Sequence, residues 1–168
     1  MARQAALLRG INVGPTTAVA MADLKASFEA LGLEDVETYL RSGNVVFSGK
    51  TTKAALEKRI AADFGRDYDV VLRTAAELRR VANACPFPTD DGKRVHVMFL
   101  DSKPKAAKLD PDRSPGDEFA VKGSEIYIHT PNGYGRSKLA PSWFEKGLGV
   151  RGTARNWNTV LKLVELTG

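Results

Sequence analysis

The sequence of 168 residues has few of the side chains on which many metal and redox sites are built. It contains one cysteine, Cys85, and two histidines, His96 and His129. A single cysteine excludes an internal disulfide, and these three residues cannot form the usual four-ligand zinc site. We therefore predict no metal site and no cofactor. One unpaired cysteine is also typical of the reducing cytoplasm.

Long hydrophobic runs are absent as well. No run approaches the ~18 apolar residues that a membrane-spanning helix needs. Only the four apolar residues 5–8 precede Arg9, whereas the core of a signal peptide needs roughly 7–15. We therefore predict a cytoplasmic protein with no membrane partner.

The composition is that of a soluble globular protein. Hydrophobic residues make up 43% and charged residues 27%, so the chain can bury a core and is not disordered. The length allows one medium domain or two small ones. Lys and Arg number 25 against 20 Asp and Glu, and this net charge of +5 mildly favours an anionic partner. The composition leaves the oligomeric state open.

The hydrophobic pattern of the segment 1–74 predicts the order strand, helix, strand, strand, helix, strand. The expected strands are 5–9, 36–41, 45–48 and 69–73, and the expected helices are 21–31 and 52–64. This order is typical of a ferredoxin-like unit.

A second unit is expected after a connecting segment. Thr74 and Glu77 form a capping box, so a helix should run from there to about residue 84 and stop before Pro86. The elements expected next are strand 94–100, helix 103–109, strands 118–122 and 125–130, and helices 141–146 and 153–166. We predict an α+β fold of two ferredoxin-like halves with antiparallel sheets, the second incomplete and extended by C-terminal helices. The predicted parts are 1–74, 75–93 and 94–168.

The expected topology of the first half brings distant polar residues together. The end of the first strand, with Arg9 and Asn12, should lie beside the hairpin turn that carries Ser42 and Asn44, near the start of the first helix. A cation, turn amides and a helix N-terminus resemble an anion site. The alternative also stays open, because a tight turn needs Gly and Asn in any case and Arg9 can pair with an acidic residue.

A second polar cluster lies near the C-terminus. Arg155, Asn156 and Asn158 are expected in the first turn of the last helix, where a cation opposes the helix dipole and suggests a bound anion or a neighbouring carboxylate. The loop 131–138 adds Ser137 and Lys138. These residues fit an anion-binding loop, and they equally fit helix caps and a solvated turn.

Four segments resemble the signatures of one bacterial family, catalogued as domain of unknown function 1697. They are LLRGINVG at 7–14, TYLRSGNVVF at 38–47, GRSKL at 135–139 and TARNWNT at 153–159. The resemblance implies an α+β fold of two ferredoxin-like halves and no established activity. It also implies a polar signature of Arg9, Asn12, Ser42, Asn44, Ser137, Lys138, Arg155, Asn156 and Asn158. The family's usual lysines after Gly14 are missing here, which counts against a loop that follows a nucleic-acid backbone.

Three functions remain open on this sequence. The first is binding of a small anionic or phosphate-containing ligand, which includes a nucleotide or a nucleic acid, although the strands lack the aromatic pattern of RNA-binding sheets. The second is an enzyme that acts on a small phosphorylated or carboxylated substrate, for which the signature segments supply no evident base. The third is a structural or interaction protein whose polar residues only hold turns.

Overall fold

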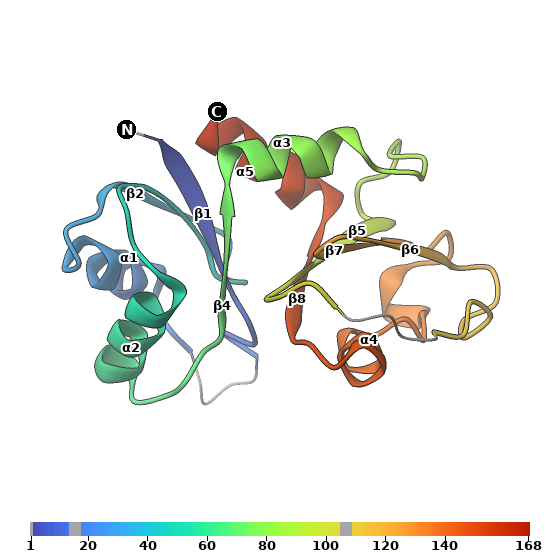
Figure 1. Ribbon diagram of the computed structural model, residues 1–168, viewed down its shortest axis with the longest axis horizontal. Helices are drawn as coiled ribbons and strands as arrows, with labels where there is room; N and C mark the ends of the chain where they lie inside the picture. Colours follow the sequence, from blue (N-terminus) through green and yellow to red (C-terminus); the bar gives the residue numbers. More distant parts are fainter. Residues whose placement is uncertain (1, 14–17, 105–108) are drawn as a thin grey trace. The chain divides into compact units, whose positions relative to one another are not determined.

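The computed structural model describes residues 2–13, 18–104 and 109–168, and it shows an α+β protein with two four-stranded sheets (Figure 1). All paired strands in both sheets are antiparallel. The chain divides into two compact units. Unit 1 comprises Met1–Leu78 with Leu163–Gly168, and unit 2 comprises Arg79–Lys162.

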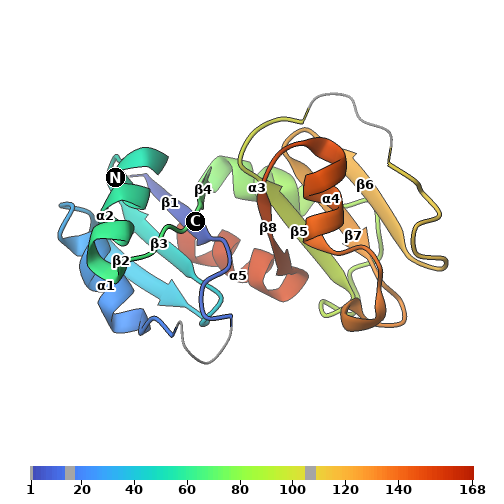
Figure 2. The ribbon, with the colours of Figure 1, turned by 90° about the horizontal axis from the view of Figure 1, so that it is seen from below.

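Unit 1 contains a sheet with two helices on one face (Figures 1 and 2). Its strands stand in the order β2-β3-β1-β4, and its elements follow the predicted order along the chain. They are β1 (Arg3–Leu8), α1 (Met21–Glu29), β2 (Glu34–Tyr39), β3 (Asn44–Ser48), α2 (Lys53–Phe64) and β4 (Val70–Thr74). Since β1 and β2 both pair with β3 in antiparallel fashion, they run in the same direction.

Local sequence signals explain why these elements begin and end where they do. The Thr52 side chain accepts a hydrogen bond from the Ala55 amide and so caps α2. Gly65 ends α2 in the left-handed conformation, with φ of 69°. The apolar faces of α1 and α2 pack on the sheet around Phe28 and Phe47, whose ring centroids are 5.5 Å apart. This core holds β1 and β3, the strands that lead into the site described below.

The helix α3 (Ala75–Asn83) begins at the predicted capping box. The Glu77 carboxylate accepts from the Thr74 amide at 2.9 Å, and the Thr74 hydroxyl accepts from the Glu77 amide at 3.1 Å. Both bonds satisfy amides that a helix start would otherwise leave unpaired.

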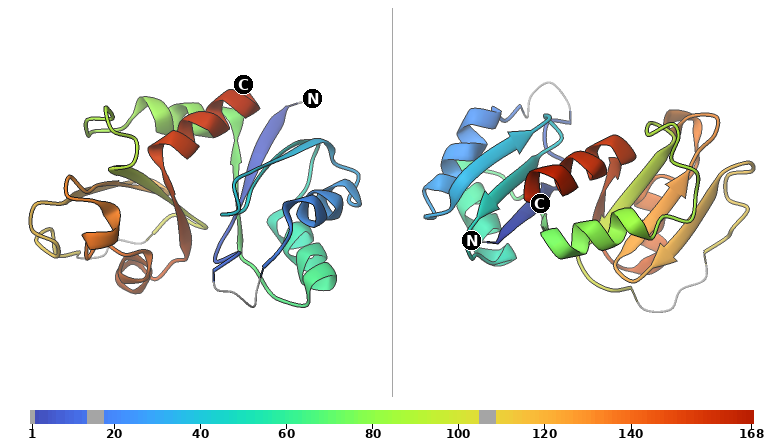
Figure 3. Two further views of the ribbon diagram at one scale, coloured as in Figure 1. Left: turned by 180° about the vertical axis from the view of Figure 1, so that it is seen from behind. Right: turned by 90° about the horizontal axis from the view of Figure 1, so that it is seen from above.

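Unit 2 contains the second sheet, with the strand order β6-β7-β5-β8 (Figure 3). Its elements are β5 (Val95–Leu100), β6 (Glu118–Lys122), β7 (Glu125–His129), the short 3₁₀ helix η1 (Tyr134–Arg136), α4 (Pro141–Leu148) and β8 (Gly152–Asn156). The last helix, α5 (Trp157–Thr167), begins in unit 2 and ends in unit 1. The helix α4 packs on the face of the sheet that carries Met98, Ile126 and Ile128.

The prediction of one helix over 153–166 was wrong in its first turn. Residues Gly152–Asn156 form the strand β8, which pairs along β5 from His96↔Asn156 to Leu100↔Gly152. A Cβ atom on Gly152 would lie 2.6 Å from the Phe99 carbonyl oxygen, so the two strands approach closely there. Arg155 therefore does not lie in the first turn of a helix, and the dipole argument made for it does not apply.

Two further findings concern the other predicted features. The helix expected over 103–109 falls largely on residues 105–108, which lie outside the described residues. Among the helices that the structure describes, none has the length and apolar character needed to span a lipid bilayer.

Candidate functional site

The end of β1 and the turn between β2 and β3 lie against each other in unit 1. We call residues 9–13 and 40–44 together the loop end. The amide of Leu8, the last residue of β1, donates a hydrogen bond to the Gly43 carbonyl in the turn at 2.9 Å. A Cβ atom on Gly43, where φ is +86°, would lie 2.6 Å from a methyl carbon of Ile11. The strand directions thus bring together two segments that are distant from each other in the chain.

Asn12 fastens the two segments to each other. Its side-chain amide donates to the Arg41 carbonyl at 2.8 Å and to the Val19 carbonyl at 3.2 Å. Its side-chain oxygen accepts from the Val19 amide, just before α1 begins. Asn12 itself has φ of 57°, a left-handed conformation that asparagine tolerates better than most residues. One side chain therefore joins the end of β1, the start of α1 and the hairpin turn.

Asn44 performs the same task inside the hairpin turn. It is fully buried, and its side-chain amide donates to the Tyr39 carbonyl at 2.7 Å and to the Ser42 hydroxyl at 3.0 Å. Ser42 itself is exposed. Asn44 thus shapes the turn from within, and Ser42 lies on its surface.

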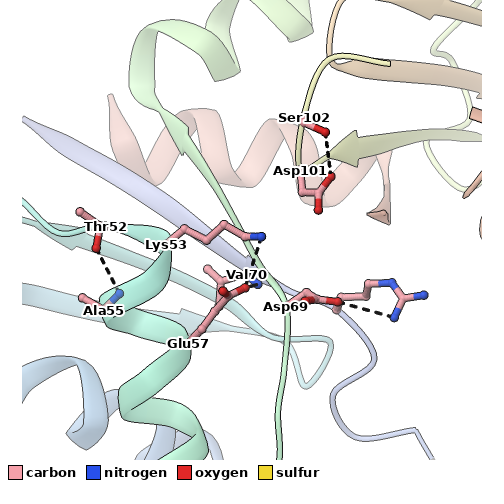
Figure 4. Close-up of polar contacts among 9 residues, drawn as sticks. Thr52, Lys53, Ala55, Glu57, Asp69, Val70, Asp101 and Ser102 are labelled. Atoms are coloured by element: carbon pink, nitrogen blue, oxygen red, sulfur yellow. Dashed lines mark hydrogen bonds and ion pairs between the residues drawn. The ribbon is translucent and has the colours of Figure 1, made fainter. Parts of the chain in front are cut away.

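Arg9 supplies a cation at this end of the sheet. Its guanidinium lies 3.9 Å from the Asp69 carboxylate, and its amide donates to the Asp69 carbonyl at 2.9 Å. Figure 4 shows this contact of Asp69 beside the start of β4. The Arg9 side chain is 38% exposed, and Arg41 is exposed on the neighbouring turn. The anticipated pairing of Arg9 with an acidic residue is present, and part of the side chain still faces solvent.

The Asp69 segment is in turn held by α2. The Glu57 carboxylate accepts from the Val70 amide at 2.8 Å and lies 3.5 Å from the Lys53 ammonium (Figure 4). These contacts fix the chain next to Asp69, and through Asp69 they fix the position of Arg9.

In unit 2, Ser137 and Lys138 lie in a loop held by a different serine. The Ser114 hydroxyl donates to the Asp117 carboxylate at 2.6 Å and accepts from the Lys138 amide at 3.1 Å. The Ser137 hydroxyl accepts from the Leu139 amide at 3.0 Å. Ser137 therefore shapes its own turn, and Lys138 is exposed.

Arg155 is buried, with 5% of its surface exposed. Its guanidinium donates to the Thr153 hydroxyl and to the Ala154 carbonyl, the latter at 3.0 Å. Burial lowers its pKa to about 10, and the group remains charged at neutral pH. Within unit 2, Arg155 is thus an internal cation of β8.

The two asparagines after Arg155 take part in the start of α5. The Asn156 side-chain oxygen accepts from the Thr159 amide at 2.9 Å and caps the helix. Asn158 is exposed, and its side chain packs on Gly92, so a larger residue at position 92 would require the Asn158 side chain to shift.

A stacked pair of rings, His96 and Tyr134, was not predicted from the sequence. Their centroids are 3.8 Å apart and the planes differ by 14°. His96 lies opposite Asn156 across the β5–β8 pair, and Tyr134 begins the turn before Ser137. The pair therefore packs β5 against the turn that precedes Ser137 and Lys138. No motif signals it, because the two rings come from segments far apart in the chain.

Both rings carry a buried polar atom that has no hydrogen-bond partner within the described residues: His96 Nδ1 and the Tyr134 hydroxyl. Burial lowers the pKa of His96 to about 4 and raises the pKa of Tyr134. Both groups are therefore neutral at pH 7.

The predicted residues thus fall into separate clusters within the units. Arg9, Asn12, Ser42 and Asn44 share the loop end of unit 1. In unit 2, Ser137 and Lys138 lie in one loop, whereas Arg155, Asn156 and Asn158 lie at the junction of β8 and α5. The described segments hold no group of three or more His, Cys, Asp and Glu side chains placed to bind a metal ion.

Comparisons with known proteins bear on both units. The profile of the family described as protein of unknown function (DUF1697) matches residues 1–127. The chain belongs to this family. The matched range includes the whole loop end, where two of the four signature segments recognised in the sequence also lie. No curated protein matches the chain. The structure resembles that of conserved bacterial protein SP0830 from Streptococcus pneumoniae, with a TM-score of 0.73, 24% identity and coverage of 99% of both chains. At this identity the likeness shows the fold alone.

Proposed function

We propose that this DUF1697 protein binds a small phosphate-type anion at the loop end of unit 1. Arg9 contacts the anion, Ser42 donates a hydrogen bond to it, and Asn12 and Asn44 hold the two loops in place. The observation that carries the proposal is a half-exposed arginine on a frame fixed by side-chain hydrogen bonds from both loops. A frame held in this way loses little entropy when it binds a ligand.

The net positive charge at the loop end supports the binding of an anion there. Arg9 and Arg41 contribute two positive charges, and Asp69 removes one. A guanidinium has five N–H donors, so Arg9 can keep Asp69 as a partner while other donors reach a phosphate oxygen. Asp69 then orients Arg9 and reduces its flexibility.

For unit 2 the proposal assigns three kinds of role. Ser137 and Asn156 hold their own turns, because the side-chain oxygen of each accepts a hydrogen bond from a backbone amide. Lys138 is an exposed cation of its loop, as Arg136 is, and serves as a second point of attraction for anions. Arg155 and Asn158 support β8 and the start of α5, since one is internal and the other packs on Gly92.

Titration with inorganic phosphate tests the proposal. Amide signals of residues 9–13 and 40–44 should shift in a saturable manner in NMR spectra. Arg9→Gln should weaken binding at least tenfold, because a charge-assisted hydrogen bond contributes about 1.5–3 kcal/mol. Arg3→Gln is the matched control. It changes the net charge by the same amount, and Arg3 lies at the opposite end of the same strand. Equal loss in both variants would show only a general effect of charge.

The competing function is purely structural. It is favoured by the same hydrogen bonds, because Asn12, Asn44, Ser137 and Asn156 all have intramolecular partners. On that view Arg9→Gln and Ser42→Ala change the melting temperature and no phosphate response exists in the wild-type protein. The phosphate titration therefore separates the two functions.

The cytoplasm is the compartment we propose for this protein. The thiol of Cys85 is half-buried with its Sγ 3.7 Å from the Phe87 carbonyl oxygen, and burial raises its pKa. Such a thiol is a poor nucleophile, and a single unpaired cysteine is typical of proteins in a reducing environment.

Nucleic acid remains the less favoured anion, and its signature would be a steep loss of affinity with salt.

A further inference from the structure

The loop end also carries exposed apolar side chains. Five large apolar residues are exposed in the described part of the chain, and the two with the greatest exposure are Val13 at 68% and Leu40 at 52%. Both lie beside the hydrogen bond from Asn12 to the Arg41 carbonyl, one residue away on each side. The two most exposed apolar residues of the described chain thus lie in the same two segments as Arg9 and Arg41, and Leu40 directly precedes Arg41.

Leu40 is unusual in its backbone as well. Its φ is 60°, in the left-handed region that glycine and asparagine occupy easily and that is disfavoured for leucine. The turn needs this conformation but does not need a leucine to adopt it. The exposed side chain gains little from burial that could offset the strain. A disfavoured backbone and an exposed apolar side chain at one position point to a role in binding.

We propose that the loop end binds a phosphate monoester that carries an aromatic ring, as an aryl phosphate or a nucleotide does. This inference rests on the proposed function, because Arg9 holds the phosphate. Val13 and Leu40 then cover one face of the ring. Charge complementarity selects the anion, and the apolar pair selects the group attached to it.

The size of the expected effect follows from the apolar area. A ring that buries roughly 50 Å² of apolar surface on Val13 and Leu40 gains about tenfold in affinity over the bare anion. Phenyl phosphate should therefore bind about ten times more tightly than inorganic phosphate. Both ligands should shift the amide signals of residues 9–13 and 40–44.

Leu40→Asn is the decisive variant. Asparagine accepts the left-handed conformation, so the variant should fold and melt at an equal or higher temperature. It should keep its affinity for inorganic phosphate and lose most of the tenfold gain for phenyl phosphate. Leu161→Asn, which removes an exposed leucine from α5, should keep the gain.

The outcomes distinguish this inference from the function on which it rests. If neither ligand shifts the loop-end signals, both fail. If both ligands bind with equal affinity, or if Leu40→Asn keeps the full gain, the inference fails and the phosphate site stands. If Leu40→Asn weakens both ligands equally, Leu40 shapes the loop and does not contact the ring, which also overturns the inference.

Discussion

Replacing His96 with phenylalanine should reduce the acid sensitivity of the folded protein. His96 is neutral and stacked on Tyr134 at 3.8 Å, and a phenyl ring can keep that stacking without a titratable group. Burial lowers the pKa of His96 from 6.5 to about 4. Between these two pH values, His96 is therefore protonated in the unfolded chain and neutral in the folded protein.

The sign and size of the effect follow from proton linkage. The contribution of His96 to stability is fully present above pH 6.5 and is lost as the pH falls toward 4. Each unit of pKa shift corresponds to about 1.36 kcal/mol, so the whole effect is about 3 kcal/mol. Between pH 7 and 4.5 the wild-type protein should lose about 2 kcal/mol more than His96→Phe. Carboxylate titrations occur in both proteins and cancel in the comparison.

Urea unfolding at pH 7 and pH 4.5, followed by circular dichroism, measures this difference. NMR titration of the imidazole provides a direct check, and His129→Gln leaves His96 as the one histidine to observe. An imidazole that titrates near pH 6.5 in the folded protein would refute the reasoning. So would equal losses of stability in wild type and His96→Phe.

Three further substitutions test the local structure of the His96–Tyr134 pair and of the loop end. Tyr134→Phe removes a buried hydroxyl without a described partner and should raise the free energy of unfolding by about 1 kcal/mol, measured by urea denaturation; a loss would show that the hydroxyl is satisfied. Asn12→Ala removes three hydrogen bonds and should cost about 2–4 kcal/mol, seen as a lower melting temperature; an unchanged melt would contradict the fastening role. Gly43→Ala places a methyl group against Ile11 at positive φ and should cost about 1–3 kcal/mol in the same assay, with Gly133→Ala as the control at positive φ but in open space; equal losses in both would leave only the backbone effect.

Much of the first unit could be predicted because its signals are local. The predicted capping box at Thr74 and Glu77 acts over a short stretch of chain and is present. The cap at Thr52 and the glycine after α2, which bound the predicted second helix, are local signals of the same kind. The meeting of the end of β1 with the turn between β2 and β3 also followed from the sequence, since strand directions in a βαββαβ order fix which ends lie together.

The wrong prediction for residues 153–156 arose because strand pairing there depends on residues distant in the chain. The segment Gly152–Asn156 shows no clear apolar alternation, and it follows a helix and precedes another. It forms a strand because β5, far earlier in the chain, offers an edge whose backbone groups it satisfies. Helical periodicity begins only at Trp157, so the period alone could not place the boundary.

The sequence by itself determined the α+β class, the family, the cation and the turn residues of the loop end, because these depend on local propensity and strand order. The tertiary structure decided what each polar group does. It shows Asn12 and Asn44 bound to backbone carbonyls, Arg155 inside β8, and Arg9 half-exposed beside Asp69. Hydrogen-bond partners and burial are set by contacts between segments far apart in the chain, and no local pattern specifies them.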